Sequence, residues 1–238
     1  MEKSIELCGR SVAYELQRKK VKNINLRINA DGSVHVSADS RVPLREVEAF
    51  VRSRGSRVIA ALDRFAAAAK SAPRPENFED GERLCLFGEI KTLRIVRGGR
   101  AVRCEGGELL LPAGAGDTRE TRERRLRRWL RGQGIAAVTA ACDRLYPIYR
   151  DCGIAYPELR FRSMRRRWGS CMPLSGVLTF NTALAAVPPD CIDYVVAHEF
   201  THFLRADHSP EFYRRLSEVV PDWAEKRKML SNYAGILG

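Results

Sequence analysis

Three of the four histidines in this chain lie within eleven residues, in the segment 198–208. The segment begins with the letters HEFTH, so His198 and His202 are four residues apart. In an α-helix, residues four apart share one face, and both imidazoles can point at one metal ion. Glu199 lies about 100° round the helix, where it flanks the metal without being a ligand. The motif constrains this segment to a helix and indicates a hydrolytic zinc site with Glu199 as general base for metal-activated water.

The flanking residues favour a buried helix around this motif. Pro188 and Pro189 end the preceding segment, and Asp190 can cap the helix with Asp193 as the acidic residue of its third position. A polar His-Glu pair inside an apolar helix needs partners, because burying unpaired polar groups is costly. The competing interpretation is a chance match on a solvated helix. The apolar residues that argue against it are Ile192, Val195, Val196, Phe200, Phe203 and Leu204.

His208 can join His198 and His202 only if the helix ends between them, because six residues of unbroken helix span about 9 Å. Asp207 tolerates the left-handed conformation that ends helices, and Ser209-Pro210 is typical of a new helix start. We therefore predict that His208 lies in a tight turn as the third metal ligand, leaving the fourth position to water. The alternative places His208 in solvent and takes a carboxylate ligand from Glu211, Glu218 or Glu225.

The cysteines and the apolar segments favour a reduced, cytoplasmic location. The seven cysteines are odd in number and scattered, and they form no C-x-x-C pair, which is typical of free thiols. No apolar stretch is long enough to span a bilayer, and the first residues lack the apolar segment of a signal peptide. We therefore expect no membrane partner.

The net charge of +12 adds nucleic acid to the partners that can be considered. A solvated arginine-rich face is the alternative interpretation, because aromatic residues are not interleaved as base stacking requires. The arginines form two clusters, one with Arg119, Arg122, Arg124, Arg125, Arg127, Arg128 and Arg131, the other with Arg160, Arg162, Arg165, Arg166 and Arg167.

Hydrophobic periodicity predicts an α+β protein with two regions. Residues 1–114 are expected to form an N-terminal antiparallel β-rich region with one helix over residues 44–68. Its strands are predicted at 12–17, 24–28, 33–38, 84–87, 92–96, 101–104 and 109–111. Residues 115–238 are expected to form a small zincin-type catalytic domain. It contains a long helix over 118–150, strands near 158–163, 167–172 and 176–181, and then the helix with the HEFTH motif.

Several short runs between about residues 155 and 235 are recognisable: RWGSC (167–171), GVLTFN (176–181), Pro188, IDYVVAHE (192–199), His208-Ser209, Phe212 and Pro221-Asp222. In these runs the sequence resembles the YgjP-like metallopeptidases, small intracellular zincins similar in their catalytic core to SprT-like proteases. The resemblance implies His198, His202 and His208 as zinc ligands and Glu199 as the catalytic base. It also implies that the substrate lies along an edge strand, for which the strand at 177–181 is the candidate. Phe200, Asp207 and Tyr213 depart from the family's usual Leu, Asn and Trp, and none of them removes a ligand.

These observations predict a zinc metalloendopeptidase that hydrolyses peptide bonds in proteins or peptides. A second hypothesis is a nucleic-acid-associated protease or binding protein that acts on proteins bound to DNA or RNA, motivated by the charge and the SprT-like resemblance. A third is a metal-binding module without catalysis, which Glu199 argues against because a structural site needs no base. A metzincin would place a glycine at Arg205, so that assignment is weak.

Overall fold

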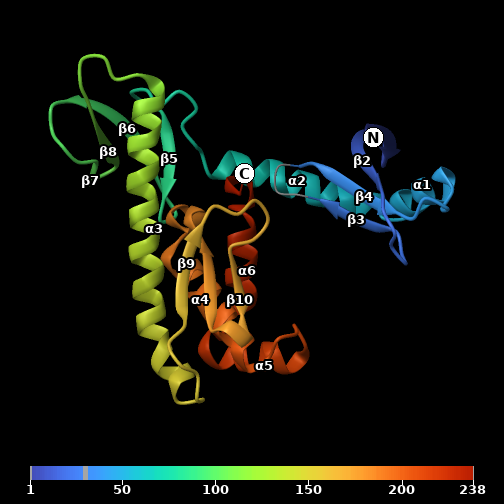
Figure 1. The fold of residues 1–238 in the computed structure, drawn as a ribbon. Helices are drawn as coiled ribbons and strands as arrows, with labels where there is room; N and C mark the ends of the chain where they lie inside the picture. The colour runs from blue at the N-terminus through green and yellow to red at the C-terminus, as the bar shows by residue number, and fades with distance from the viewer. Residues whose placement is uncertain (1, 29–31, 238) are drawn as a thin grey trace.

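The computed structural model describes residues 2–28 and 32–237 and has an α+β fold, as the sequence predicted. The described strands form three small sheets that follow one another along the chain. In Figure 1 the first sheet lies to one side, and the other two lie along one long helix. Each sheet contributes to a hydrophobic cluster of its own.

The first sheet contains a parallel pairing that the sequence did not indicate. The hairpin of β3 and β4 is antiparallel, as predicted, whereas β2 and β4 pair in parallel. Residues 29–31, between β3 and β4, lie outside the described residues. In spatial order the strands are β1 (Glu2–Leu7), β2 (Arg10–Arg18), β4 (Val34–Ala38) and β3 (Asn25–Ile28).

The helix expected over residues 44–68 is two helices, α1 (Leu44–Arg52) and α2 (Gly55–Ser71). The Ser53 hydroxyl donates to the carbonyl oxygen of Phe50 at 2.8 Å, a local bond that competes with helical pairing. Gly55 then starts α2 where a side chain would meet Leu7 of β1 at 3.5 Å. Low helix propensity at Ser53 and Gly55 thus places the break that apolar periodicity alone did not reveal.

The second sheet packs against the first half of the long helix α3 (Arg119–Arg150). Thr118 caps α3 in a reciprocal capping box with Thr121. Leu126 of α3 joins the cluster formed by Leu93 and Leu109 of the sheet. The strands are β5 (Arg83–Leu86), β6 (Glu89–Arg97), β8 (Glu108–Ala113) and β7 (Arg103–Glu105), in that spatial order.

The third sheet corrects the position of one predicted strand. Its order is β10 (Gly169–Met172), β11 (Val177–Asn181) and β9 (Glu158–Arg162), so β11 is central and cannot be the edge strand that was expected. All five residues of β11 are buried. The edge that faces the C-terminal helices is β10, which contacts α4. These helices are α4 (Pro189–Leu204), α5 (Pro210–Val219) and α6 (Trp223–Ser231).

The expected division at residue 114 falls between β8 and α3, and the two-domain organisation stays a prediction. Within the described part of the chain, no helix is long and apolar enough to cross a membrane.

The turn between β5 and β6 ties the second sheet to the start of α4. The amides of Phe87 and Gly88 donate to the carbonyl oxygens of Ala185 and Ala186, at 2.8 and 3.0 Å. Gly88 has a φ of +84°, and a Cβ there would lie 2.7 Å from Cγ of Pro188. Only glycine fits this approach without displacing the residue that precedes α4.

We predict that Gly88→Ala lowers the free energy of unfolding by more than Gly81→Ala, measured by chemical denaturation. Gly81 has a φ of +86° and no atom within 4 Å of its added Cβ, so it isolates the backbone strain. That strain costs about 1–2 kcal/mol, and the contact with Pro188 should add about 1–3 kcal/mol at Gly88. Equal losses for the two variants would show that the turn does not press on Pro188.

Candidate functional site

The N-cap of helix α4 lies two residues earlier than the sequence suggested. Pro188 occupies the N-cap position without a side-chain bond, and Pro189 is the first helical residue, so Asp190 does not cap the helix. Asp190 instead accepts from Nζ of Lys226 at 2.6 Å, which ties α4 to α6. Asp193 pairs with Arg144 of α3. Asp190 therefore attaches α4 to α6, and Asp193 attaches it to α3.

A buried tyrosine of α3 holds the middle of α4. The hydroxyl of Tyr149 donates to the carbonyl oxygen of Ala197 at 2.9 Å and lies 3.1 Å from Oγ1 of Thr201. Thr201 donates to the same carbonyl at 2.7 Å. The Tyr149 ring also stacks on Phe200 with ring centroids 4.9 Å apart. This contact fixes α4 immediately before His198 and thus the direction in which that imidazole points.

The helix ends where the sequence required it to end, but by a different backbone conformation. Leu204 is the last helical residue, and Arg205 is extended with φ −149° and ψ 111°. Asp207 is not among the residues with positive φ, so the left-handed stop expected there is wrong. The carbonyl oxygen of Arg205 lies 3.2 Å from Nδ1 of His202. Ser209 caps α5 through the amide of Phe212, with Pro210 at the first position, as predicted.

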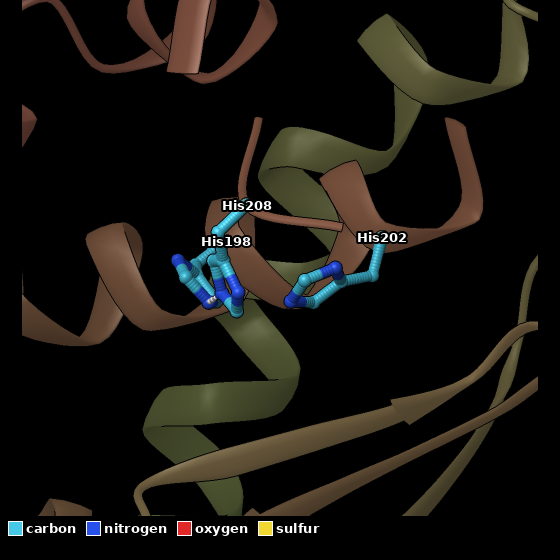
Figure 2. Close-up of side chains that lie close together, drawn as sticks. All are labelled: His198, His202 and His208. Carbon is cyan, nitrogen blue, oxygen red and sulfur yellow. Dashed lines mark hydrogen bonds between the residues drawn. The ribbon is translucent and has the colours of Figure 1, made fainter. Parts of the chain in front are cut away.

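The turn brings His208 back beside the two histidines of α4 (Figure 2). Nε2 of His208 lies 3.1 Å from Nε2 of His198. One ring nitrogen from each of the three histidines lies within 4.8 Å of the others. His202, one helical turn after His198, faces the same point. The fourth histidine of the chain, His35, lies in β4 and pairs with Glu15.

One aromatic ring supports all three imidazoles. The ring centroid of Phe212 lies 4.9 Å from that of His198, 4.7 Å from His202 and 4.9 Å from His208. Phe212 is completely buried at the first turn of α5. Its ring therefore forms an apolar floor that limits where the three rings can turn.

The two imidazoles of α4 are held in the neutral state that metal binding requires. Burial, and then the neighbouring His202 and His208, lower the pKa of His198 to about 3. Burial likewise lowers the pKa of His202. Neutral imidazoles bind metals, whereas imidazolium does not. Nδ1 of His198 is also buried without a hydrogen-bond partner among the described residues. The group of three histidines therefore fits one metal ion.

The carboxylates considered as alternative ligands are engaged elsewhere or exposed. Glu211 pairs with Arg214 and Arg215, which lower its pKa to about 2. Glu218 also pairs with Arg214. Glu225 is exposed on α6. Among the described residues, only His198, His202 and His208 form a group with the spacing of metal ligands.

Glu199 is buried next to the start of β10. The residue is 6% exposed, and its Oε2 has no hydrogen-bond partner among the described residues. Burial raises the pKa of Glu199 to about 8, and the charge of Arg167 acts in the opposite direction. A Cβ at Gly169 would lie 2.5 Å from Oε1 of Glu199. Gly169 thus provides the space that the carboxyl group occupies.

Several supporting residues escaped the sequence analysis. Tyr149 was one of many apolar positions in a long helix, and nothing local marked it as the partner of Ala197. Gly169 stood in the RWGSC run, and its role depends on a contact with a residue thirty positions away. Cys171, in the same strand, has its pKa raised to about 12 by burial and by Glu199. Its thiol therefore stays protonated and is not a nucleophile.

The first arginine cluster mainly holds neighbouring segments to α3. Arg127 pairs with Glu123 of the same helix at 2.7 Å. Such contacts use charge that would otherwise face solvent, and nucleic-acid binding by this surface stays a prediction. Four members donate to main-chain carbonyl oxygens elsewhere: Arg119 to Glu76, Arg122 to Phe78, Arg125 to Pro112 and Arg131 to Phe161.

A family model matches most of the chain. A sequence model described as the YgjP-like metallopeptidase domain matches residues 22–233. A solved structure, the metallopeptidase zymogen of Pyrococcus abyssi abylysin, is 20% identical with a TM-score of 0.35. That similarity covers 39% of this chain and 90% of the other. A search of curated proteins finds no match.

We predict that Glu199→Gln stabilises the metal-free protein at neutral pH. When burial raises the pKa of a carboxyl group in the folded state, the protein loses stability as the pH rises from the unfolded pKa of 4.5 to the folded pKa of about 8. Glutamine removes this cost, so the free energy of unfolding should rise by about 3 kcal/mol at pH 7 and change little at pH 4. Denaturant titrations at both pH values measure the difference. The exposed Glu225→Gln serves as the control, and a gain of the same size there would contradict the assignment of the cost to burial.

Proposed function

The chain belongs to the YgjP-like metallopeptidase family, and we propose that it is a zinc-dependent endopeptidase with Glu199 as its general base. Membership makes it a peptidase hydrolase that uses a metal ion and acts on proteins or peptides. The observation that carries the proposal is the convergence of three histidine nitrogens within 4.8 Å, with a buried glutamate beside them.

Zinc is the metal that this group of residues suits best. Three imidazoles with one position left open are the usual protein ligands of catalytic zinc. Nitrogen ligands at tetrahedral zinc lie about 3.3 Å apart, and Nε2 of His198 and His208 are separated by 3.1 Å. No carboxylate joins the group among the described residues, which disfavours the oxygen-rich sites of magnesium and calcium.

The surroundings of Glu199 suit proton transfer at neutral pH. A carboxyl group with a pKa near the working pH can both accept and return a proton. A bound zinc ion would supply Lewis-acid activation of water and of the scissile carbonyl. Glu199 would take the proton of the attacking water and deliver it to the nitrogen of the leaving amine. The peptide bond and water then become a carboxyl group and an amine.

We propose that the peptide substrate lies along β10, in place of the central β11. β10 is an edge strand whose first residue, Gly169, abuts Glu199. Exposed edge strands usually carry a charged residue, a proline or a bulge that prevents pairing with another strand. β10 has the sequence GSCM, which contains no charged residue and no proline. The opposite edge is partly occupied, because Arg131 donates to the carbonyl oxygen of Phe161 in β9 at 3.2 Å. Strand addition at β10 would hold a peptide by its main chain next to the base.

Glu199→Gln should retain zinc and lose nearly all hydrolysis, because only proton transfer is removed. General-base catalysis contributes about 10²–10⁴-fold, so kcat should fall by at least about 100-fold. The measurement combines metal analysis of the purified variant with cleavage of an unstructured protein such as casein. Parent-like cleavage by this variant, with zinc bound, would exclude Glu199 as the base.

His208→Ala should weaken zinc binding at least about 100-fold, since it removes one of three proposed ligands. Glu211→Ala, Glu218→Ala and Glu225→Ala are the matched controls, and each should bind zinc like the parent. Competition with a chelator of known affinity measures the dissociation constants. If one of the glutamate variants loses zinc and His208→Ala keeps it, the third ligand is a carboxylate.

A further inference from the structure

Three consecutive exposed arginines lie in the loop that leads into β10. Arg165, Arg166 and Arg167 follow the buried Met164 and precede Trp168. Among the side chains that the structure describes, no carboxylate forms an ion pair with any of the three. They differ in this from Arg160 of the same cluster, which pairs with Glu158 at 2.7 Å. Their charge is therefore available to another molecule.

The main chain of this loop is fixed by a buried amide. Nδ2 of Asn181 donates to the carbonyl oxygens of Met164 at 2.6 Å and Arg167 at 2.9 Å. Its main-chain amide donates to Trp168 at 2.8 Å, and its Oδ1 accepts from Ala183 at 3.0 Å. Asn181 is 1% exposed, so these bonds are shielded from water. The loop is thus held in place before any ligand arrives, which lowers the entropy cost of binding.

The loop ends where the catalytic carboxyl group lies. Gly169, which follows Trp168, is in contact distance of Glu199. The positive charge of Arg167 also lowers the pKa of Glu199, against the effect of burial. A peptide that adds to β10 beside Glu199 therefore runs past these arginines close to the bond to be cleaved. All three arginines are exposed, and Arg167 lies two residues before Gly169 in the chain.

We propose that Arg165, Arg166 and Arg167 select peptides with aspartate or glutamate close to the cleaved bond. This inference rests on the proposed peptidase function and names its substrate class. Guanidinium groups bind carboxylates with two parallel hydrogen bonds, and unpaired arginines on a fixed loop offer that geometry. Three like charges side by side also repel basic segments, which adds discrimination against cationic peptides.

The test compares two peptides with the zinc-loaded enzyme. A fluorogenic decapeptide with aspartates flanking the cleaved bond is paired with the same peptide carrying asparagines. The parent should prefer the acidic peptide about tenfold in kcat/KM at low salt, mainly through KM, and the preference should shrink as salt screens the charges. A variant with Arg165→Gln, Arg166→Gln and Arg167→Gln should lower the ratio to about one.

A second triple variant controls for total charge. Arg97→Gln, Arg100→Gln and Arg128→Gln remove the same three charges from exposed positions of the second sheet region and α3. This variant should keep the acidic preference, and its loss here would reduce the effect to overall charge and overturn the proposal. If the loop triple variant does not fold, Arg166→Gln alone should still lower the ratio measurably.

The outcomes separate this inference from the proposed function. Cleavage of neither peptide, nor of casein, by zinc-loaded parent enzyme would contradict the peptidase function itself. Equal cleavage of both peptides would leave that function standing and overturn the acidic preference. Adding a short single-stranded oligonucleotide tests the other polyanion. If it inhibits the parent but not the loop variant, while the peptides are cleaved equally, the arginines bind nucleic acid and the proposal is wrong.

Discussion

The burial of polar groups on α4 is the constraint around which the catalytic half is arranged. His198 and Glu199 lie on a helix whose other residues are mostly apolar. Desolvation lowers the pKa of His198 and raises that of Glu199, so it favours the neutral form of both side chains. Residues of α3, α5 and β10 limit how far these side chains can move. Tyr149 fixes the main chain before them, Phe212 lies under the rings, and Gly169 yields space to the carboxyl group. These side chains are already desolvated in the folded protein, so binding a cation adds little further desolvation cost for them.

The sequence revealed those parts of the site that depend on local spacing. The distance from His198 to His202 along a helix, the cap at Ser209 and the helix start at Pro210 all follow from neighbouring residues, and the structure has them. The gathering of the three histidines was also expected, since one turn of chain suffices to return His208. The backbone that makes this turn was not foreseen. Arg205 leaves the helix in an extended conformation, and no left-handed residue is needed at Asp207.

Features that depend on distant contacts were predicted less well. Strand positions in the third sheet were correct, but periodicity gives no spatial order, and β11 proved to be the middle strand. The parallel pairing of β2 with β4 was missed for the same reason. The helix break at Ser53 was hidden because the apolar residues continue on both sides of it. Local chemistry therefore fixed the types of element, and tertiary contacts fixed their neighbours.

Helix α3 belongs to two hydrophobic clusters at once, with Leu126 in the cluster of the second sheet and Val138 and Ala141 in the cluster around α4. α3 is one continuous helix of 32 residues, and helices bend only gently. A displacement of α3 in one cluster would therefore disturb its packing in the other. The cluster of the first sheet shares no described residue with either. In native-state hydrogen exchange, the second sheet and the histidine site would thus open as one cooperative unit, and the first sheet would open separately. The second sheet contributes no side chain to the three-histidine group, yet through α3 its stability would affect how long the site stays folded.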